Sequence, residues 1–285
     1  MRCFLYAAAG FALATPALGN STSWVWQDNP SSVLKDPEYH AGPSGAEMDL
    51  DRAHIGPVLY GGAGVWQCAN RGHIALTFDD GPSNFTANIA RAFEKENMRV
   101  TFFMTGYNLG RKIDSGPWPA LIRKLDKAGH QIGSHSWIHK NFGKVSAKEI
   151  EDEMRFNEKA FMKIFKKVPR YMRPPFAICP KACAEVMENL GYHIIQFNLD
   201  TLDYKHQKKG LIQKSINKID KQMGPNGTGS YIVLNHDIHE LTATSLVPAV
   251  IKFVKQRGYK AVTVGECLND PKVNWYRDEW GGVYE

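Results

Sequence analysis

From residue 73 onward, short apolar segments of strand length alternate with longer segments whose apolar residues recur at helical spacing. Strands that alternate with helices favour a parallel sheet. Several such units within about 200 residues predict an α/β fold, an irregular (β/α) barrel with a mainly parallel strand barrel surrounded by helices. The expected strands are 73–78, 100–104, 171–173, 193–197, 231–235 and 261–264, and the expected helices are 87–96, 119–128, 147–165, 180–190, 210–223 and 245–257. Ser146 and Glu149 form a capping box before the third of these helices.

The segments outside this alternation have other patterns. Residues 1–19 have the composition of a signal peptide, in which Arg2 precedes a short apolar stretch and Ala17-Leu18-Gly19 offers small residues for cleavage. A buried N-terminal helix is the alternative. Residues 20–72 are rich in Gly, Pro, Ser and Asp and are expected to form a loop-rich N-terminal arm, and 269–285 form a C-terminal tail.

Composition restricts the class of protein. The chain has 285 residues, of which 43% are hydrophobic and 22% charged, which is ordinary for a globular protein and argues against disorder. No apolar run reaches the roughly 18 residues of a membrane-spanning helix, and the C-terminus lacks the hydrophobic tail of a lipid-anchor signal. The net charge of +6 is too small to indicate a nucleic-acid partner. We expect a monomer without a membrane anchor, secreted to the extracellular space or the cell wall.

Removal of the signal peptide leaves four cysteines, Cys68, Cys179, Cys183 and Cys267. An even number in an oxidising compartment favours two disulfides, and the sequence allows three pairings. Cys179 and Cys183 are close enough to close a local loop, and Cys68 would then pair with Cys267. A zinc site made of four thiolates is the rival interpretation, but the usual C-x-x-C pairs are absent.

Three N-x-S/T sequons are candidate glycosylation sites in a secreted protein, at Asn20, Asn84 and Asn226.

Polar residues follow the predicted strands, where α/β folds place their chemistry. Asp79 and Asp80 close the first strand, and Gly81-Pro82 ends it, so both carboxylates can turn toward one site. Alone, this segment would be interpreted as an ordinary turn.

His135 and His139 are the second candidate pair. Their spacing of four places both imidazoles on one face of a helical turn. Two neutral imidazoles and one carboxylate make a three-ligand zinc site with open positions for water and substrate. A lone H-x-x-x-H is a weak signal, but an Asp-Asp pair at a neighbouring strand end strengthens it.

Two further segments carry polar groups. Arg173, before two prolines, can fix a carboxylate through its planar fork. His236 ends a later strand, and near a buried Asp such a histidine is a tunable acid.

Five segments in this order resemble the polysaccharide deacetylase family, which has the NodB homology domain and is carbohydrate esterase family 4: 77–82, 131–139, 171–176, 198–204 and 232–236. The resemblance covers roughly residues 72–268, so that 73–268 would be the deacetylase domain. Residues 258–268 are similar to fungal chitin deacetylases in particular. The implied activity is removal of N-acetyl groups from N-acetylglucosamine residues of chitin or chitooligosaccharides, which releases acetate.

The resemblance also implies roles for single residues. Asp80, His135 and His139 would hold one divalent metal ion, zinc or alternatively cobalt. Asp79 would be the general base, and Arg173 would orient it.

On the other side of the site, His236 would be the general acid that protonates the departing amine. Asp200 would tune it, and Asp203 is the less favoured candidate for that role.

Three residues would contact the substrate. The backbone N–H of Phe176 would donate to the oxyanion, and Leu234 would line a pocket for the acetyl methyl group. Tyr204 would form an aromatic wall. The family more often has Tyr at the first of these positions and Trp at the last, which puts the support of the site by Tyr204 in doubt.

Other functions remain open at this point. The same site can cleave an ester, so O-deacetylation of acetylxylan is the alternative activity. An inactive carbohydrate-binding protein on the same scaffold is a second class. An iron oxygenase with two histidines and one carboxylate is a third, and the β/α alternation together with Arg173 and His236 argues against it. No G-x-S-x-G motif is present, which disfavours a serine esterase.

Overall fold

The computed structural model describes residue 48 and residues 50–278. The predicted signal peptide, the sequon at Asn20, residues 20–47 of the N-terminal arm and residues 279–285 of the tail lie outside the described residues.

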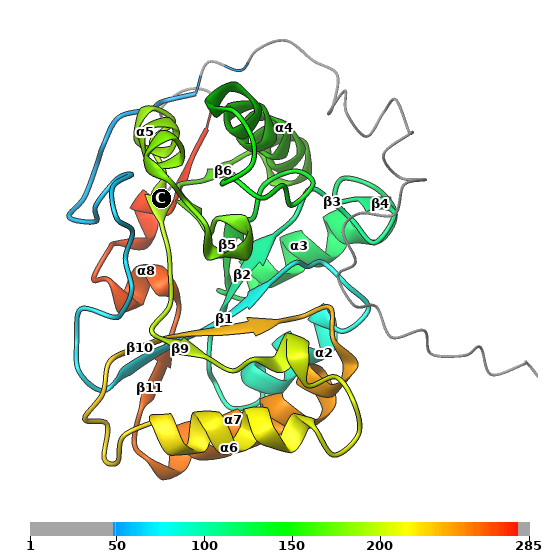
Figure 1. Cartoon of the computed structure of the whole chain (residues 1–285), viewed down its shortest axis with the longest axis vertical. Coiled ribbons are helices and arrows are strands. Elements are labelled where there is room, and N and C mark those ends of the chain that lie inside the picture. Colours follow the sequence, from blue (N-terminus) through cyan, green and yellow to red (C-terminus); the bar gives the residue numbers. More distant parts are fainter. Residues whose placement is uncertain (1–47, 49, 279–285) are drawn as a thin grey trace, which may run out of the picture.

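One sheet of eight strands forms the centre of the molecule, and all of its ladders are parallel. Seven strands follow the order β8-β7-β5-β2-β1-β10-β9, and β11 pairs with β1 beside them. This curved parallel sheet with helices around it confirms the predicted α/β barrel class (Figure 1). The strands are β1 (His73–Asp79), β2 (Thr101–Met104), β5 (Gln131–Ser134), β7 (Tyr171–Met172), β8 (His193–Ile194), β9 (Leu199–Asp200), β10 (Tyr231–His236) and β11 (Lys260–Val262).

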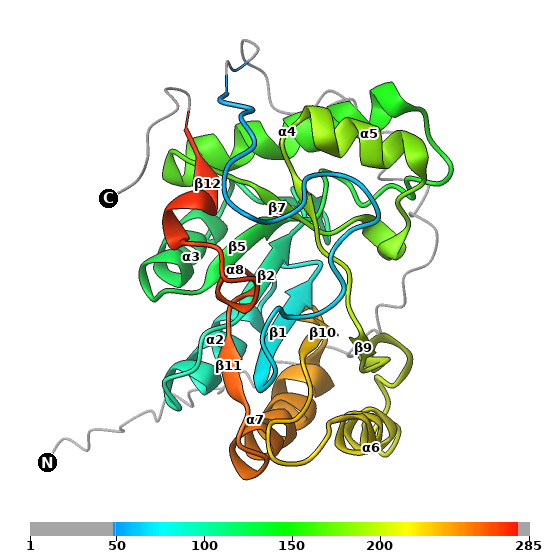
Figure 2. The same ribbon diagram turned by 90° about the vertical axis from the view of Figure 1, so that its left-hand side faces the viewer.

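Helices lie around the sheet and bury one face each against it (Figure 2). They are α2 (Thr86–Glu94), α3 (Trp118–Lys127), α4 (Ala147–Phe165), α5 (Lys181–Asn189), α6 (Ile212–Gln222), α7 (Val247–Gln256) and the short α8 (Val264–Cys267). A π-helical turn, Thr242–Leu246, leads into α7, and short 3₁₀ turns cover Pro175–Ala177, Asp203–Lys205 and Lys272–Asn274. The remaining strands form two small antiparallel pairs, β3 (Tyr107–Asn108) with β4 (Arg111–Lys112) and β6 (Val168–Pro169) with β12 (Tyr276–Arg277).

The strand β5 was not predicted, because its sequence Gln-Ile-Gly-Ser has a single apolar side chain of strand type. Its place in the sheet depends on tertiary packing. A Cβ atom at Gly133 would lie 2.5 Å from the ring of Phe103 on the neighbouring strand, so glycine permits the close approach of β5 to β2.

Among the described residues, no ladder joins the two end strands, β8 and β9. Residues 50–68, which we call the strap, run along this side of the sheet (Figure 2). The N–H of Val65 donates to the carbonyl of Ile194 at 2.8 Å, and the N–H of Gln196 donates to the carbonyl of Val65 at 2.8 Å. The described part of the predicted N-terminal arm therefore extends the edge of the sheet at β8.

Two disulfides are present, Cys68–Cys267 and Cys179–Cys183, with Cα–Cα distances of 4.8 and 5.1 Å. The predicted pairing is confirmed, and the four-thiolate zinc site is wrong because all four sulfur atoms are bonded in pairs. The first disulfide fixes the end of the strap to α8.

A buried ionic cluster joins the strap, α4 and β12. The guanidinium of Arg52 donates to both carboxylate oxygens of Glu158, at 2.6 and 2.8 Å, and Arg277 donates to Glu158 Oε1 at 3.1 Å. Burial alone would raise the pKa of Glu158, but the two guanidinium groups hold it below its usual value.

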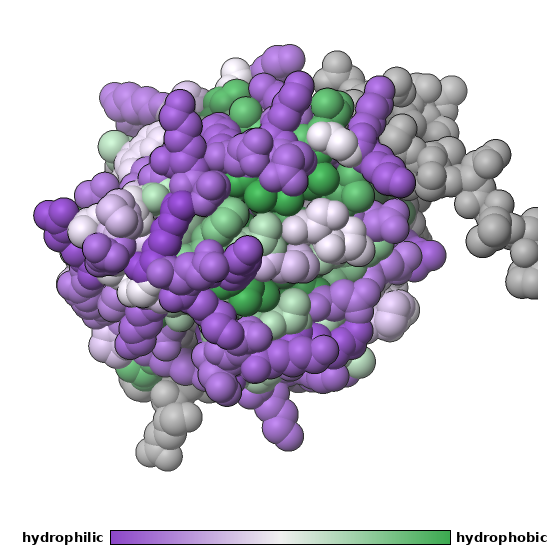
Figure 3. Space-filling model, turned by 90° about the horizontal axis from the view of Figure 1, so that it is seen from below, coloured by the Kyte–Doolittle hydropathy of each residue, from purple (hydrophilic) through white to green (hydrophobic). Residues whose placement is uncertain are grey.

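Figure 3 shows the face on the side of α6 and α7, where hydrophilic residues form most of the surface and apolar residues reach it in a central band. The helix α6 buries Ile212, Ser215 and Ile219 along one face, so its opposite, polar face contributes to this hydrophilic surface. Within the described part of the chain, every helix is too short or too polar to cross a bilayer.

Candidate functional site

The chain turns sharply at the carboxyl end of β1. Asp80 has a φ of 75°, a left-handed conformation that breaks the strand alternation. As a result, both carboxylates approach one side chain: His135 Nε2 lies 3.9 Å from Asp79 Oδ2 and 3.3 Å from Asp80 Oδ1. The two aspartates therefore face one site, as the sequence predicted.

A residue that the sequence analysis missed, Asp237, supports this turn. Asp237 is fully buried and accepts a hydrogen bond from Thr86 Oγ1 at 2.5 Å. A Cβ atom at Gly81 would lie 2.2 Å from Asp237 Oδ2, so only glycine fits between the turn and this carboxylate. Burial raises the pKa of Asp237 to about 7. Its position directly after His236 was the only signal in the sequence.

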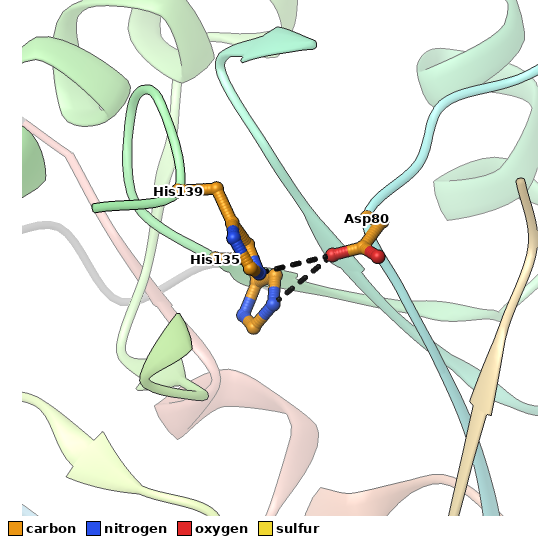
Figure 4. Close-up of side chains that lie close together, drawn as sticks. All are labelled: Asp80, His135 and His139. Carbon is orange, nitrogen blue, oxygen red and sulfur yellow. Dashed lines mark ion pairs between the residues drawn. The ribbon is translucent and has the colours of Figure 1, made fainter. Parts of the chain in front are cut away.

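Asp80, His135 and His139 converge with their ligand atoms toward one point (Figure 4). Asp80 Oδ1 lies 3.3 Å from His135 Nε2 and 3.3 Å from His139 Nε2, and all three residues are buried. In a tetrahedral site with bonds of about 2.0–2.1 Å, ligand atoms lie about 3.3–3.4 Å apart. All three ligand atoms lie within 4.8 Å of one another. The donor set and the two distances from Asp80 therefore fit a small divalent cation such as zinc.

The segment that carries the two histidines is a loop. The predicted helical turn is wrong: Ser136 and His139 have left-handed φ values of 65° and 59°. Tertiary hydrogen bonds override the local preference, since the N–H of Gly106 donates to the carbonyl of Ser136 and the N–H of Tyr107 to that of Trp137. The imidazoles still meet, with ring centroids 4.9 Å apart.

The protonation of the three side chains suits metal binding. His135 Nδ1 lies 2.7 Å from the carbonyl oxygen of Arg173, which can only accept, so Nδ1 carries the proton and Nε2 presents a lone pair to the site. Burial lowers the pKa of His139 to about 3, which keeps it neutral. Two neutral nitrogens and one carboxylate oxygen are thus available.

Arg173 fixes Asp79 with one hydrogen bond, from Nη1 to Oδ1 at 2.9 Å. Its other donors bind the Thr77 hydroxyl and the backbone carbonyls of Ile195 and Gln196. The predicted contact is present. The guanidinium donates to several acceptors, however, and makes one hydrogen bond to the carboxylate instead of a bidentate pair.

His236 is paired with Asp203, so the expectation that Asp200 is its partner is wrong. His236 Nδ1 lies 2.8 Å from Asp203 Oδ1, and Asp203 Oδ2 accepts the backbone N–H of His236 at 2.8 Å. Asp200 instead accepts the N–H of Leu202. Burial alone would lower the pKa of His236, but the Asp203 carboxylate raises it to about 10.

The proposed substrate residues lie around these groups. The ring of Phe176 packs edge-on against His139 with centroids 4.6 Å apart, and that of Tyr204 against His236 at 5.2 Å. Both aromatic side chains are partly open to solvent, with 52% and 38% exposed. Leu234 is two residues before His236 in β10, so it lies on the same face of the strand.

The catalytic candidates are held at adjacent strand ends, because Asp79 of β1 and His236 of β10 are register partners. A carboxylate that can accept a proton and an imidazole that can donate one therefore flank a candidate metal centre. This arrangement is suited to hydrolysis of an acyl bond.

The comparisons with known proteins agree with this geometry. Residues 67–195 match the family model described as polysaccharide deacetylase. The chain is 40% identical over 217 residues to a chitin deacetylase of Colletotrichum lindemuthianum, with 76% of this chain and 87% of that protein covered. It is 35% identical to a chitin deacetylase of Pestalotiopsis sp., with 83% and 76% covered. The solved structure of the Colletotrichum lindemuthianum enzyme matches with a TM-score of 0.74 and 38% identity, over 81% of this chain and 98% of that chain.

Proposed function

This chain belongs to the polysaccharide deacetylase family. We propose that it is a secreted, metal-dependent chitin deacetylase. It removes N-acetyl groups from N-acetylglucosamine residues of chitin or chitooligosaccharides and releases acetate. The observation that carries the proposal is the buried triad of Asp80, His135 and His139 beside an aspartate that is held by Arg173. The names of the relatives support the choice of substrate.

Asp80, His135 and His139 would hold one zinc ion, with cobalt as an alternative of the same coordination. When bound there, zinc supplies a Lewis acid that lowers the pKa of water and polarises the acetyl carbonyl.

The side chains on the base side prepare the attack. Asp79 accepts a proton from the water that adds to the carbonyl carbon, and the hydrogen bond from Arg173 orients Asp79. The backbone N–H of Phe176 donates to the oxyanion that forms, a contribution that can reach about 3 kcal/mol.

The side chains on the acid side complete the reaction. His236 gives its proton to the amine nitrogen as the C–N bond breaks, because an unprotonated amine is a poor leaving group. Asp203 stabilises the imidazolium. Leu234 lines the space for the acetyl methyl group, and Tyr204 forms an aromatic wall for the sugar.

Two disulfides support an oxidising destination outside the cell. Asn84 and Asn226 are both exposed and are the proposed glycosylation sites among the described residues.

The proposal is tested by incubating the purified protein with N-acetylglucosamine oligomers and with acetylated xylan, with and without chelator, and measuring acetate. We expect acetate from the oligomers, loss of activity after chelation, and recovery when zinc is added. Acetate from xylan alone would instead establish the ester activity. No acetate from either substrate with zinc-loaded protein would contradict a deacetylase and leave an inactive carbohydrate-binding protein.

A further inference from the structure

The loop from His135 to His139 is held by a residue that does not belong to the catalytic groups described above. Glu153 lies on α4 and is 2% exposed. Its Oε2 atom accepts the backbone N–H of Trp137 at 3.1 Å and that of Ile138 at 2.8 Å. Both donors lie between the two candidate metal ligands. Glu153 therefore binds the centre of the loop that sets their separation.

A hydrogen bond inside the loop adds to this anchor. The backbone N–H of His139 donates to Ser136 Oγ at 3.1 Å, so the two left-handed residues on either side of Trp137 and Ile138 are tied to each other. Glu153 holds the two N–H groups that lie between them.

The loop needs such an anchor because it cannot stabilise itself as a helix. Left-handed conformations at two non-glycine residues, Ser136 and His139, each cost of the order of 1 kcal/mol and persist only when surrounding contacts enforce them. The carbonyls of Ser136 and Trp137 are held from one side by β3 and the residue before it. Glu153 holds the N–H groups from the other side, so the loop is bound on both of its polar edges.

Another buried glutamate on the same helix has a different environment. Glu158 is neutralised by Arg52 and Arg277. For Glu153 the nearest cation among the described residues is Lys140, with Nζ 3.9 Å away. The hydrogen bonds of Glu153 therefore go mainly to the loop, and this difference makes Glu158 a matched control.

We propose that Glu153 is a positioning residue for the metal centre: its carboxylate fixes the loop so that His135 and His139 present their nitrogen atoms at the spacing a small divalent cation requires. The inference rests on the metal site proposed above and extends it to α4. Outer groups that orient metal ligands typically contribute about 10–100-fold to metal affinity.

The test compares Glu153→Ala, Glu153→Gln and the control Glu158→Gln with the wild-type full chain. Zinc dissociation constants are measured by competition with a chromophoric chelator, without substrate. We expect zinc binding about 10–100-fold weaker in Glu153→Ala. Glu153→Gln should lose affinity in the same direction but less, because the amide oxygen of glutamine can still accept the N–H groups of Trp137 and Ile138. Glu158→Gln should bind zinc like the wild type, even though it loses stability.

Two further readouts separate positioning from general stability. Cobalt-loaded Glu153→Ala should show an altered visible absorption spectrum, since that spectrum depends on ligand geometry, and Glu158→Gln should keep the wild-type spectrum. The activity of the Glu153 variants should recover at high zinc concentration.

Each result has a defined meaning. Wild-type zinc affinity and an unchanged cobalt spectrum in the Glu153 variants would overturn the role of Glu153, and so would equal losses in the Glu158 control. If Glu153→Ala does not fold, the comparison of Glu153→Gln with Glu158→Gln decides in the same way. Failure of the wild-type protein to bind zinc would instead refute the metal site itself.

Discussion

Asp200 and Asp203 are three residues apart, and their different surroundings show what a sequence says about single residues. Asp203 is fully buried and receives the His236 ring, whereas Asp200 binds the N–H of Leu202. The left-handed φ of 57° at Leu202 turns the chain between them. The types and order of the site residues were predictable. Which of two aspartates meets the histidine depends on a turn that no local pattern encodes.

The hydrogen bond between His236 and Asp203 predicts that Asp203→Asn changes the pH dependence of activity. The Asp203 carboxylate raises the pKa of His236, so its removal lowers that pKa, and the protonated acid is lost at a lower pH. We expect the alkaline limb of the kcat profile to move toward neutral pH. Asp200→Asn is the control and should leave the limb in place. A larger shift in Asp200→Asn than in Asp203→Asn would contradict the assignment.

For Asp79→Asn we expect a loss of turnover of about 10²–10⁴-fold, the usual contribution of a general base. Zinc should still bind, because Asp79 is outside the triad of Asp80, His135 and His139. Acetate release and elemental analysis measure the two properties separately. A metal-loaded Asp79→Asn variant with wild-type turnover would exclude Asp79 as the base.

His135→Ala should lose the metal, because it removes one of the three proposed ligands. Elemental analysis of the purified variant measures this.

At the scale of elements, helices were easier to predict than short strands. The helix α4 begins and ends at the expected residues, because its apolar period is long and a capping box marks its start. The short strands β7 and β8 lie within the predicted segments 171–173 and 193–197. The strand β9 and the β3–β4 hairpin were not predicted, because two residues are too few to show a period. For the loop of the two histidines, the spacing of four between His135 and His139 was the only basis for predicting a helical turn. Its left-handed residues are enforced by partners on β3 and α4 that are distant in sequence.

The capping box of α4 gives a prediction at this scale. Ser146 Oγ accepts the N–H of Glu149, and Glu149 Oε2 accepts the N–H of Ser146 at 3.0 Å. We expect Ser146→Ala to reduce the free energy of unfolding by about 1 kcal/mol. Ser146→Asp keeps an acceptor and should stay close to the wild type. Urea denaturation measures both, and equal stabilities for the two variants would show that the cap contributes nothing.

At the scale of the whole molecule, contacts distant in sequence hold both ends of the described part of the chain to the barrel. The strap extends the sheet edge at β8, and Arg52 and Arg277 share one buried glutamate. Loop-rich sequence predicted an arm in this region but gave no indication of where it packs. The reason is that single residues such as Val65 and Arg52 make these contacts, without a periodic pattern.

The two disulfides should differ in their contribution to stability. Cys68–Cys267 closes a loop of 199 residues and Cys179–Cys183 a loop of 4. The chain-entropy relation gives about 5 kcal/mol for the first and about 2 kcal/mol for the second. We therefore expect the double Ser variant of the long-range pair to have the larger decrease in unfolding free energy in urea. The reverse order would show that local geometry, and not loop closure, dominates.

The pairing of β11 with the beginning of β1 has a consequence for biosynthesis. A ribosome completes His73–Ala75 long before it reaches their neighbours Lys260–Val262, which come much later in the sequence. Until then the nascent polypeptide carries an open strand edge, a feature that invites aggregation. We therefore expect a product truncated shortly before residue 260 to contain every proposed site residue and still to aggregate through this open edge.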